Sequence, residues 1–596
     1  MPTYIRLTDY KSSDEKEKGF FDPKNRYEAK QEDFKKIPGS PIAYWVSDRI
    51  KEIFESSKKL GEIAEPRQGL ATGNNDLFMR IWSEVPFNEI GFNIKNRNEA
   101  FKSKLKWFPY NKGGEFQKWY GNQEYLVNWN CDGVEIQNFF DKNGKLRSRP
   151  QNKDYYFLKS ISWTLLSSSY FAVRAFPYGF IFDVNGMSLF IDDKGYNYLV
   201  SFLSSKLSFY FLRIINPTLA FQVGNIKALP IIFPKDDSIK QKIDQLTQQN
   251  IDISKEEWDS REISWDFRTN ELIRMKNEIL QKETCKIEDA YNAYCEYWEE
   301  KFFTLHKNEE ELNRLFIGIY ELEDELTPDV ALEDITILKN EAKIVDGKLV
   351  FQADEIMKQF ISYGVGVMFG RYSLDHKGLH VANMSESLSD ANAKFDIAVP
   401  TFEADDDNII PVLEDDYFKD DIASRFVQFV KSAFGQEHLS ENVKFIEDAL
   451  GKSLRKYFVK DFYEDHIKRY KKRPIYWMVS SPKKSFMSLI YMHRYETDTF
   501  ARVRNSYLLE YVTKLEAHKD ALSLTVNSQS ASDRDKKAAK QEIQKCDVKL
   551  KELIEFDRDA MMSVAQNPVE IDLDDGVKVN YCKFKEILYP IKGLCK

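Results

Sequence analysis

The sequence lacks the short cysteine and histidine patterns that hold metals. None of its six cysteines stands in a Cys-x-x-Cys pair, which argues against a zinc ribbon and against a dense disulfide framework. We therefore expect reduced thiols, as in a cytoplasm. His376 and His380 lie four residues apart, but carboxylates and cysteines are missing at ligand spacing. We expect solvated histidines there and no metal site.

Long hydrophobic runs are also missing. The first residues turn polar before the apolar core of a signal peptide could form, so we do not expect export by that route. The longest apolar stretch, Tyr198–Phe221, is interrupted by Lys206 and Arg213. A membrane span needs about twenty mostly apolar residues, so this stretch predicts a buried helix. We expect a soluble cytoplasmic protein with no membrane partner.

The common catalytic signatures are absent. We find no G-x-x-x-x-G-K-[ST] phosphate loop, no G-x-S-x-G elbow, no H-E-x-x-H pair and no G-x-G-x-x-G after a predicted strand. No catalytic residue is therefore assigned from the sequence, and the chain points to binding more than to chemistry.

The sequence does contain enough apolar residues for several cores, at 42% of its 596 residues. This size predicts two to four domains. The net charge of −9 is unevenly distributed: residues 1–234 hold 33 Lys and Arg against 26 Asp and Glu, and the remainder holds 53 against 69. The basic part is the better candidate for a polyanionic partner.

The pattern of periodicity and turns predicts an α+β multidomain protein. Hairpin signals stand at Asn185-Gly186, Asp346-Gly347 and Asp575-Gly576, and Tyr291, Tyr294, Trp298 and Phe302 form a stripe at helical spacing that predicts core. We predict a lead-in segment (1–55), a mixed α/β domain (56–234), a helical spacer (235–330), a C-terminal α/β domain (331–505), and a helical hairpin followed by a terminal β-hairpin (506–596).

Two motifs in the basic part suit DNA. Arg67, Gln68 and Asn74 carry forked donors suited to base edges or phosphates, and Thr72, Gly73 and Asn75 offer short polar or backbone contacts. The alternative is a tight turn in which Gly73 and Asn74 serve backbone geometry alone.

The second motif is the aromatic and basic block Lys106–Tyr120. Lys112 would meet a phosphate above glycines that permit close approach, while Trp107, Phe108 and Trp119 are the expected core beneath a turn. Further candidates for DNA contact are Arg174, Gln222, Asn225 and Lys227.

A basic island lies in the acidic part, from Arg455 to Tyr507, with 13 Lys and Arg against 5 Asp and Glu. Its densest stretch includes Lys471, Lys472 and Arg473, which we list as candidate phosphate contacts because such clusters release counterions. A solvated helix face is the alternative.

Four long motifs resemble the carboxy-terminal part of the PglX adenine-specific DNA methyltransferases of BREX phage-defence systems. They are Lys106–Gly114, Asn308–Ile317, Arg473–Val479 and Asp572–Asn580. The region from Leu60 to Pro234 also resembles the target-recognition domains of type I specificity subunits and fused restriction-modification enzymes.

The PglX resemblance implies an amino-terminal domain that binds S-adenosylmethionine and uses an Asn-Pro-Pro-Tyr motif on a flipped adenine. No Pro-Pro pair occurs in this sequence, so we expect no methylation by the chain alone and no cofactor within it. The resemblance places Met1 where the family's catalytic domain ends, and S-adenosylmethionine is expected on a catalytic partner.

These observations predict a DNA-binding module that specifies the target of a BREX-type adenine-N6 methyltransferase. Its expected partners are double-stranded DNA and a catalytic methyltransferase subunit or other BREX proteins. One alternative is a protein-interaction scaffold of the defence complex, or a docking site for a phage inhibitor. Another is a truncated piece of an otherwise active methyltransferase.

Overall fold

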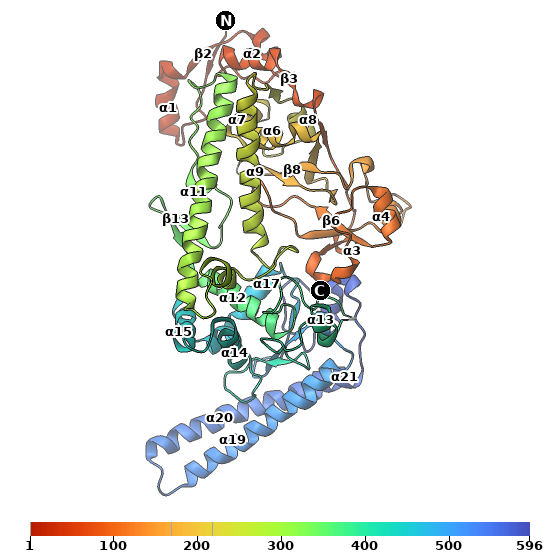
Figure 1. Cartoon of the computed structure of the whole chain (residues 1–596), viewed down its shortest axis with the longest axis vertical. Coiled ribbons are helices and arrows are strands. Elements are labelled where there is room, and N and C mark those ends of the chain that lie inside the picture. The colour runs from red at the N-terminus through yellow and green to blue at the C-terminus, as the bar shows by residue number, and fades with distance from the viewer. Residues whose placement is uncertain (1, 168–169, 217, 385, 596) are drawn as a thin grey trace. The chain divides into compact units, whose positions relative to one another are not determined.

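The computed structural model describes residues 2–167, 170–216, 218–384 and 386–595. The chain divides into two compact units, each made of three chain segments (Figure 1). The first unit contains Met1–Met79, Gly91–Trp258 and Glu299–Leu338, and the second contains Arg80–Ile90, Asp259–Trp298 and Lys339–Lys596. Both mix helices with small sheets, which confirms the predicted α+β multidomain class.

Small antiparallel sheets organise the first unit. One sheet has the order β4 (Glu65–Arg67), β11 (Gly186–Phe190), β8 (Ser160–Thr164) and β9 (Val173–Phe176). In a second sheet, β6 (Trp107–Asn111) pairs antiparallel with β7 (Tyr125–Asn128) and parallel with β10 (Ile181–Phe182). Shorter pairs join β1 (Thr3–Ile5) to β2 (Arg26–Glu28), and β3 (Lys58–Lys59) to β12 (Pro230–Ile231).

The aromatic block forms the core of this unit, as predicted. Every residue of β6 is buried, and Trp107, Phe108 and Trp119 are at most 1% exposed. Phe108 packs edge to face on Phe157, with 5.5 Å between ring centroids. Large rings dominate core energetics because each buries a wide apolar surface. These rings therefore hold the fold and are not available for stacking on bases.

Helices and short turns complete the first unit. The lead-in segment forms β1, β2 and two helices. The helices in the first two chain segments of this unit are α1 (Ser13–Phe21), α2 (Asp48–Ser56), α3 (Asn75–Phe78), α4 (Arg97–Ser103), α5 (Asn130–Gln137), α6 (Asp193–Ser204), α7 (Lys206–Ile215), α8 (Val223–Lys227) and α9 (Asp237–Asp259). Among the described residues no single helix is long and apolar enough to cross a membrane, although α6 and α7, bent by 70°, meet that test as a pair. Most residues of α6 are buried.

The hairpin predicted at Asn185-Gly186 is wrong. The two flanking runs belong to different sheets, because β10 pairs with β6 while β11 pairs with β4 and β8. Gly186 serves a close approach of backbone: a Cβ there would lie 2.4 Å from the carbonyl oxygen of Asn111. Gly186 is therefore required by this close backbone contact and not by a two-residue turn.

The predicted helical character of 235–330 is confirmed. It contains α9, α10 (Glu271–Arg274) and α11 (Ile287–Tyr320), and Tyr294, Trp298 and Phe302 of the aromatic stripe are at most 4% exposed. α11 contributes residues to both units, since the division falls after Trp298.

The second unit surrounds a small antiparallel sheet of order β15 (Ile410–Pro411), β17 (Met487–Tyr491) and β16 (Tyr476–Ser480). The hairpin predicted at Asp346-Gly347 is confirmed as β13 (Ala342–Val345) and β14 (Lys348–Phe351). The helices that follow β14 are α12 (Ala353–Met368), α13 (Leu388–Lys394), α14 (Ile422–Phe434), α15 (Leu439–Leu450), α16 (Leu454–Lys460), α17 (Phe462–Arg469) and α18 (Thr499–Arg502).

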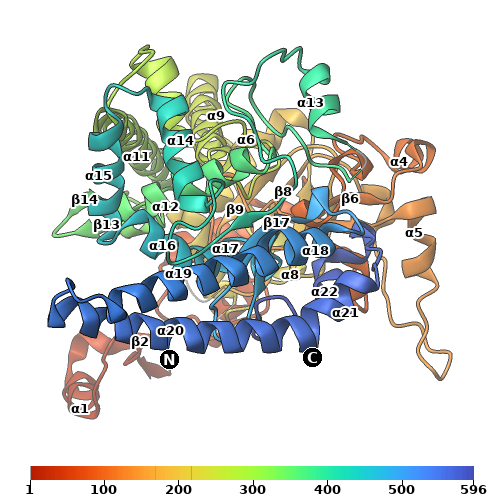
Figure 2. The ribbon, with the colours of Figure 1, turned by 90° about the horizontal axis from the view of Figure 1, so that it is seen from below.

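The helical hairpin predicted after Ser506 is confirmed. Helices α19 (Leu509–Asn527) and α20 (Asp533–Phe556) lie side by side in both views (Figures 1 and 2). α21 (Met562–Gln566) follows them. The terminal β-hairpin is wrong, because α22 (Gly576–Cys582) occupies that position. Val577 and Tyr581, four residues apart, are both buried, so the helical period outweighs the turn signal of Asp575-Gly576.

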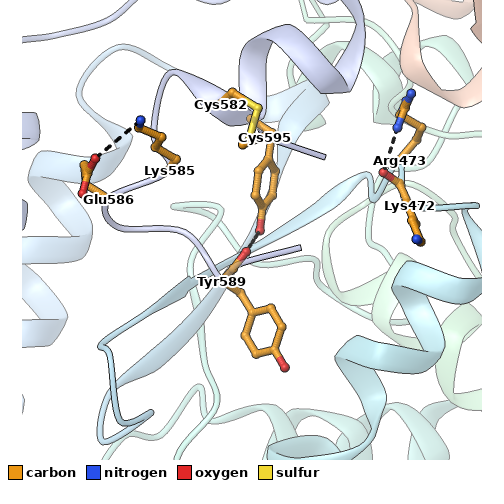
Figure 3. Close-up of a disulfide and its surroundings, with 8 residues drawn as sticks. Lys472, Arg473, Cys582, Lys585, Glu586, Tyr589 and Cys595 are labelled. Carbon is orange, nitrogen blue, oxygen red and sulfur yellow. Dashed lines mark hydrogen bonds and ion pairs between the residues drawn. A yellow bond between two sulfur atoms is a disulfide. The ribbon is translucent and has the colours of Figure 1, made fainter. Parts of the chain in front are cut away.

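The expectation that all thiols are reduced is also wrong. A disulfide joins Cys582, at the end of α22, to Cys595 near the chain end (Figure 3). Beside it, the hydroxyl of Tyr581 donates to the carbonyl oxygen of Tyr589 at 2.7 Å. The two cysteines are 13 positions apart, a spacing that carries no recognisable motif. Cys131, Cys285, Cys295 and Cys546 are not disulfide-bonded in the described part of the chain.

Candidate nucleic-acid interface

Arg67 lies at the end of β4, where it is held by neighbours from its own unit. Its Nη2 is 3.2 Å from the hydroxyl of Tyr155 and 2.5 Å from a carboxylate oxygen of Glu65, and its guanidinium lies 5.1 Å from the Tyr155 ring centroid. The hydrogen bond to Tyr155 raises the pKa of Arg67. The side chain is half-buried and therefore positioned, with part of its surface still open.

The turn after Arg67 uses several predicted contact residues to build itself. The Asn74 side chain caps α3 by accepting from the Leu77 N–H, and the Thr72 hydroxyl donates to the Asn75 side-chain oxygen at 2.7 Å. Gly73 has a φ of +75°, a region that favours glycine. The backbone oxygen of Gln68 accepts from Asn152. These bonds support the turn reading for Thr72 and Asn74, whose side-chain oxygens are already engaged.

Lys112 meets a carboxylate inside its own unit. Its ammonium lies 2.6 Å from Asp183, whose side chain is 1% exposed and also accepts a hydrogen bond from the Tyr110 hydroxyl. Gly113 follows with a φ of +79°. A buried carboxylate needs such a partner, so the ammonium predicted to bind phosphate already has a role in the fold.

Gln222, Asn225 and Lys227 belong to or flank the short helix α8, which packs near β4. The Asn225 side-chain oxygen accepts from the Gln222 N–H at 2.9 Å. Gln222 is exposed and Lys227 is half-buried. Of these three predicted contacts, Gln222 offers the most accessible side chain.

Arg174 is the predicted contact with the most unusual environment. It lies on β9, is 1% exposed and lines a cavity inside the first unit. Burial lowers the pKa of Arg174 to about 10. Such a residue cannot read an open groove.

The three predicted contacts of the basic island belong to the second unit. Lys471 and Lys472 follow α17 in an exposed turn, with φ values of +50° and +62°. The Arg473 Nε lies 3.8 Å from a carboxylate oxygen of Glu84, and its Nη1 donates to the carbonyl oxygen of Lys472 (Figure 3). The ammonium groups project from a turn and not from a continuous helix face.

One basic segment beside the Gly73 turn escaped the sequence reasoning. Between positions 142 and 149, the eight residues Lys-Asn-Gly-Lys-Leu-Arg-Ser-Arg carry four exposed cations and no acid: Lys142, Lys145, Arg147 and Arg149. The segment belongs to the loop that follows α5 (Figure 2), and this loop turns back on itself through an antiparallel bridge between Phe140 and Leu146. Arg149 and Ala71 exchange both backbone hydrogen bonds, and a Cβ on Gly73 would meet the Arg147 backbone at 2.9 Å.

The signal that would have revealed this loop is the run of like charge between Asp141 and Asp154. With the Gly73 turn it forms what we call the basic loop edge, residues 71–75 and 142–149. Its exposed cations have the chemistry required to contact a phosphate backbone.

The predicted solvation of the histidine pair is wrong for His380, which is 4% exposed. His376 Nε2 lies 2.9 Å from His380 Nδ1, and burial lowers the pKa of His380 to about 4. Across the described residues, no group of three potential ligands is placed to hold a metal.

No family model matches the chain. The adenine-specific methyltransferase PglX of Lacticaseibacillus casei (strain Zhang) is 38% identical to it over 613 residues, covering 99% of this chain and 49% of that protein. The adenine-specific methyltransferase BrxX of Escherichia coli O9:H4 (strain HS) is 34% identical over 619 residues, covering 100% of this chain and 48% of that protein. The chain thus spans about half the length of the curated relatives it matches, and along practically all of its own length it is PglX/BrxX-like.

Proposed function

We propose that this chain is the DNA-binding portion of a BREX-type adenine-N6 DNA methyltransferase and selects its target site. It corresponds in this proposal to the carboxy-terminal part of PglX and acts with a catalytic partner that carries S-adenosylmethionine. The similarity to two adenine-specific methyltransferases supports the reaction class. The sequence has no Pro-Pro pair, so the Asn-Pro-Pro-Tyr pocket for a flipped adenine is missing. This supports the proposal that the chain binds DNA while a partner transfers the methyl group.

The observation that carries the DNA-binding part is the basic loop edge. Four exposed cations follow one another on the loop of residues 142–149 without an intervening acid, and the backbone pairing of Arg149 with Ala71 fixes that loop beside the Gly73 turn. Cations of this kind bind phosphates, while short polar groups and backbone at a glycine turn come close enough to contact base edges. The edge therefore combines affinity with a route to specificity.

Binding of the full chain to short duplexes, measured by fluorescence anisotropy across a salt series, tests this proposal. Replacing Lys142, Lys145, Arg147 and Arg149 by serine is expected to weaken binding more than tenfold. It should also lower the slope of log affinity against log salt by up to about 4, since each lost phosphate contact removes roughly 0.9.

A matched control removes four exposed cations from the helical hairpin: Arg534, Lys537, Lys540 and Lys551. Both quadruple variants change the net charge equally, so only the loop variant should lose DNA binding. Equal losses in the two variants would reduce the effect to net charge and contradict the proposal. Radiolabelled S-adenosylmethionine completes the test: the chain alone should transfer no methyl group, and robust transfer would refute the division of labour.

A second candidate function, protein docking in the defence complex, is favoured by one feature of the second unit. Leu524, Val548 and Ile554 on α19 and α20 are 74%, 58% and 53% exposed, so the hairpin presents large apolar side chains that a protein partner could cover. Replacing Leu524, Val548 and Ile554 by serine separates the two candidates. Lost partner binding with unchanged DNA affinity would favour docking.

A further inference from the structure

A small cavity lies within the first unit between the ends of two neighbouring strands. It has a volume of about 110 Å³, and its lining includes Gly114, Glu115, Gln117, Thr164, Tyr170 and Arg174. A single water needs only about 10–15 Å³ of such space. The cavity therefore has room for a larger polar group.

Arg174 places a buried cation at this cavity. The residue is 1% exposed. Its Nη2 donates to the Thr164 hydroxyl at 3.2 Å, and its Nη1 lies 3.5 Å from the carbonyl oxygen of Gln117. Its Nε finds no hydrogen-bond partner in the described part of the chain. A guanidinium carries five donors, and among the residues that the structure describes two weak contacts to neutral oxygens engage them.

The same unit pairs the half-buried Lys112 and the buried Lys118 with carboxylates. The Lys118 ammonium lies 2.6 Å from Glu309, and the Lys112 ammonium lies 2.6 Å from Asp183. Burial of a charge is costly unless an opposite charge compensates it. Among the residues described, Arg174 has no carboxylate within ion-pair distance. Glu115 lines the cavity but is exposed, and burial is the only cause that shifts the pKa of Arg174.

The wall of the cavity is backbone that a glycine turn brings into place. Gly114 has a φ of +148°, and its carbonyl oxygen accepts from the Thr164 hydroxyl at 3.1 Å. This hydroxyl therefore accepts from Arg174 and donates to Gly114, which fixes the guanidinium relative to the turn. A cation held in this way is preorganised for a ligand.

We propose that this cavity is an oxyanion site in which Arg174 binds one phosphate group. Resting on the proposed function, we assign that group to the backbone of the bound DNA. The planar guanidinium matches a phosphate bidentately, and such charge-assisted pairs are the stronger hydrogen bonds. The anion would supply the compensating charge that the described residues do not provide.

The test uses the full chain and two variants at this position, Arg174→Met and Arg174→Lys. The first readout is the melting temperature with inorganic phosphate or sodium chloride at matched ionic strength. Phosphate should raise the melting temperature of the wild type, less so that of Arg174→Lys, and leave that of Arg174→Met unchanged. Without phosphate, Arg174→Met should melt no lower than the wild type, because an uncompensated charge has been removed.

The second readout is the salt dependence of duplex binding. Arg174→Met should reduce the slope of log affinity against log salt by about 1, as expected for one lost phosphate contact. Arg97→Met is the control, because its guanidinium is paired with Asp132 by a 3.0 Å hydrogen bond. This variant should lose stability and keep the phosphate response.

The outcomes separate this inference from the proposed function. A phosphate response that depends on Arg174, in a chain that binds no duplex, would support the oxyanion site and refute the DNA-binding function. An Arg174-dependent response with an unchanged salt slope would overturn the assignment to the DNA backbone. If Arg174→Met melts lower and keeps the full phosphate response, the residue is structural and the inference fails.

Discussion

At the scale of single residues, buried charge decides which polar side chains of the first unit are open to a ligand. Lys112 and Lys118 both stand in the aromatic block, and both are committed to buried carboxylates. Arg147 and Arg149 are exposed on the loop that the sequence analysis did not select. A sequence shows the type of a side chain but not its pairing, so the basic residue nearest to a motif is easily mistaken for the functional one.

The pairing of Lys112 is expected to appear in stability. Replacing Lys112 by Met leaves the buried Asp183 carboxylate with the Tyr110 hydroxyl and the Asn185 N–H. We expect the free energy of unfolding to fall by roughly 2 kcal/mol, as when a charged hydrogen-bonded partner is lost. Chemical denaturation measures it. Lys142→Met, at an exposed site, is the control and should be neutral, and an equal stability of the two variants would contradict the argument.

A buried carboxylate in the second unit predicts a pH dependence. Asp405 is 8% exposed, and burial together with Asp407 raises the pKa of Asp405 from 3.8 to about 7, against the opposing Ile409 N–H and Arg425. The folded state then binds more protons than the unfolded state between about pH 4 and 7. The protonated Asp405 side chain therefore contributes its full stabilisation of the folded state below pH 4. This stabilisation is lost as the pH rises through 7.

The variant Asp405→Asn mimics the protonated form and should remove this dependence. Relative to the variant, the wild type is expected to lose up to about 4 kcal/mol of unfolding free energy between pH 4 and pH 8. Denaturation at the two pH values measures the difference. Asp406, which is exposed, supplies the control Asp406→Asn. A wild type that gains stability relative to Asp405→Asn over this range would reverse the predicted sign.

At the scale of elements, periodicity predicted helices well and turn dipeptides predicted hairpins poorly. The aromatic stripe and the charged segments after Ser506 became α11, α19 and α20, because a sustained apolar period is a property of many residues. Of three Asn-Gly or Asp-Gly signals, only Asp346-Gly347 joins paired strands. The other two predicted hairpins are wrong, because Gly186 allows the backbone of Asn111 to approach closely and Gly576 begins helix α22. Such contacts come from distant residues.

The cap of α20 offers a test at this scale. The Ser532 hydroxyl accepts from the Asp535 N–H at 3.1 Å, which satisfies one of the unpaired donors of the first turn. Ser532→Ala should cost about 1 kcal/mol of local helix stability, seen as faster hydrogen exchange at Arg534–Lys536. Ser530→Ala, whose hydroxyl lies 2.9 Å from that of Ser528 and not at the cap, should leave exchange unchanged. Unchanged protection in Ser532→Ala would show that packing against α19 alone holds this end.

At the scale of the whole molecule, segments distant in the sequence share one core. The predicted domain 56–234, apart from residues 80–90, lies in the first unit together with residues 299–338, which include most of α11. Tyr198 packs on Phe316 with 5.3 Å between ring centroids, and the Tyr320 hydroxyl donates to the carbonyl oxygen of Pro230. The distribution of charge and the positions of the motifs identified the basic part of the chain. No local sequence pattern predicts that α11 packs against it.

Glu309 of α11 is the polar centre of this link. Its carboxylate accepts from the Lys118 ammonium at 2.6 Å and from the Trp119 indole N–H at 2.7 Å, and the residue is 5% exposed. Removing one partner of a buried pair leaves an uncompensated charge, which costs about 3–5 kcal/mol. Glu309→Ala in the full chain should therefore destabilise the first unit by about that amount, while Glu300→Ala at an exposed position of α11 should not.

The double variant Lys118→Met with Glu309→Leu removes both charges and should recover most of the loss, since apolar replacements of a buried pair are often neutral. By the same argument, an isolated fragment of residues 56–234 lacks α11 and should show less cooperative unfolding than the full chain by circular dichroism. A fragment that melts as cooperatively as the full chain, with Glu309→Ala neutral, would mean that the recognition region folds without α11.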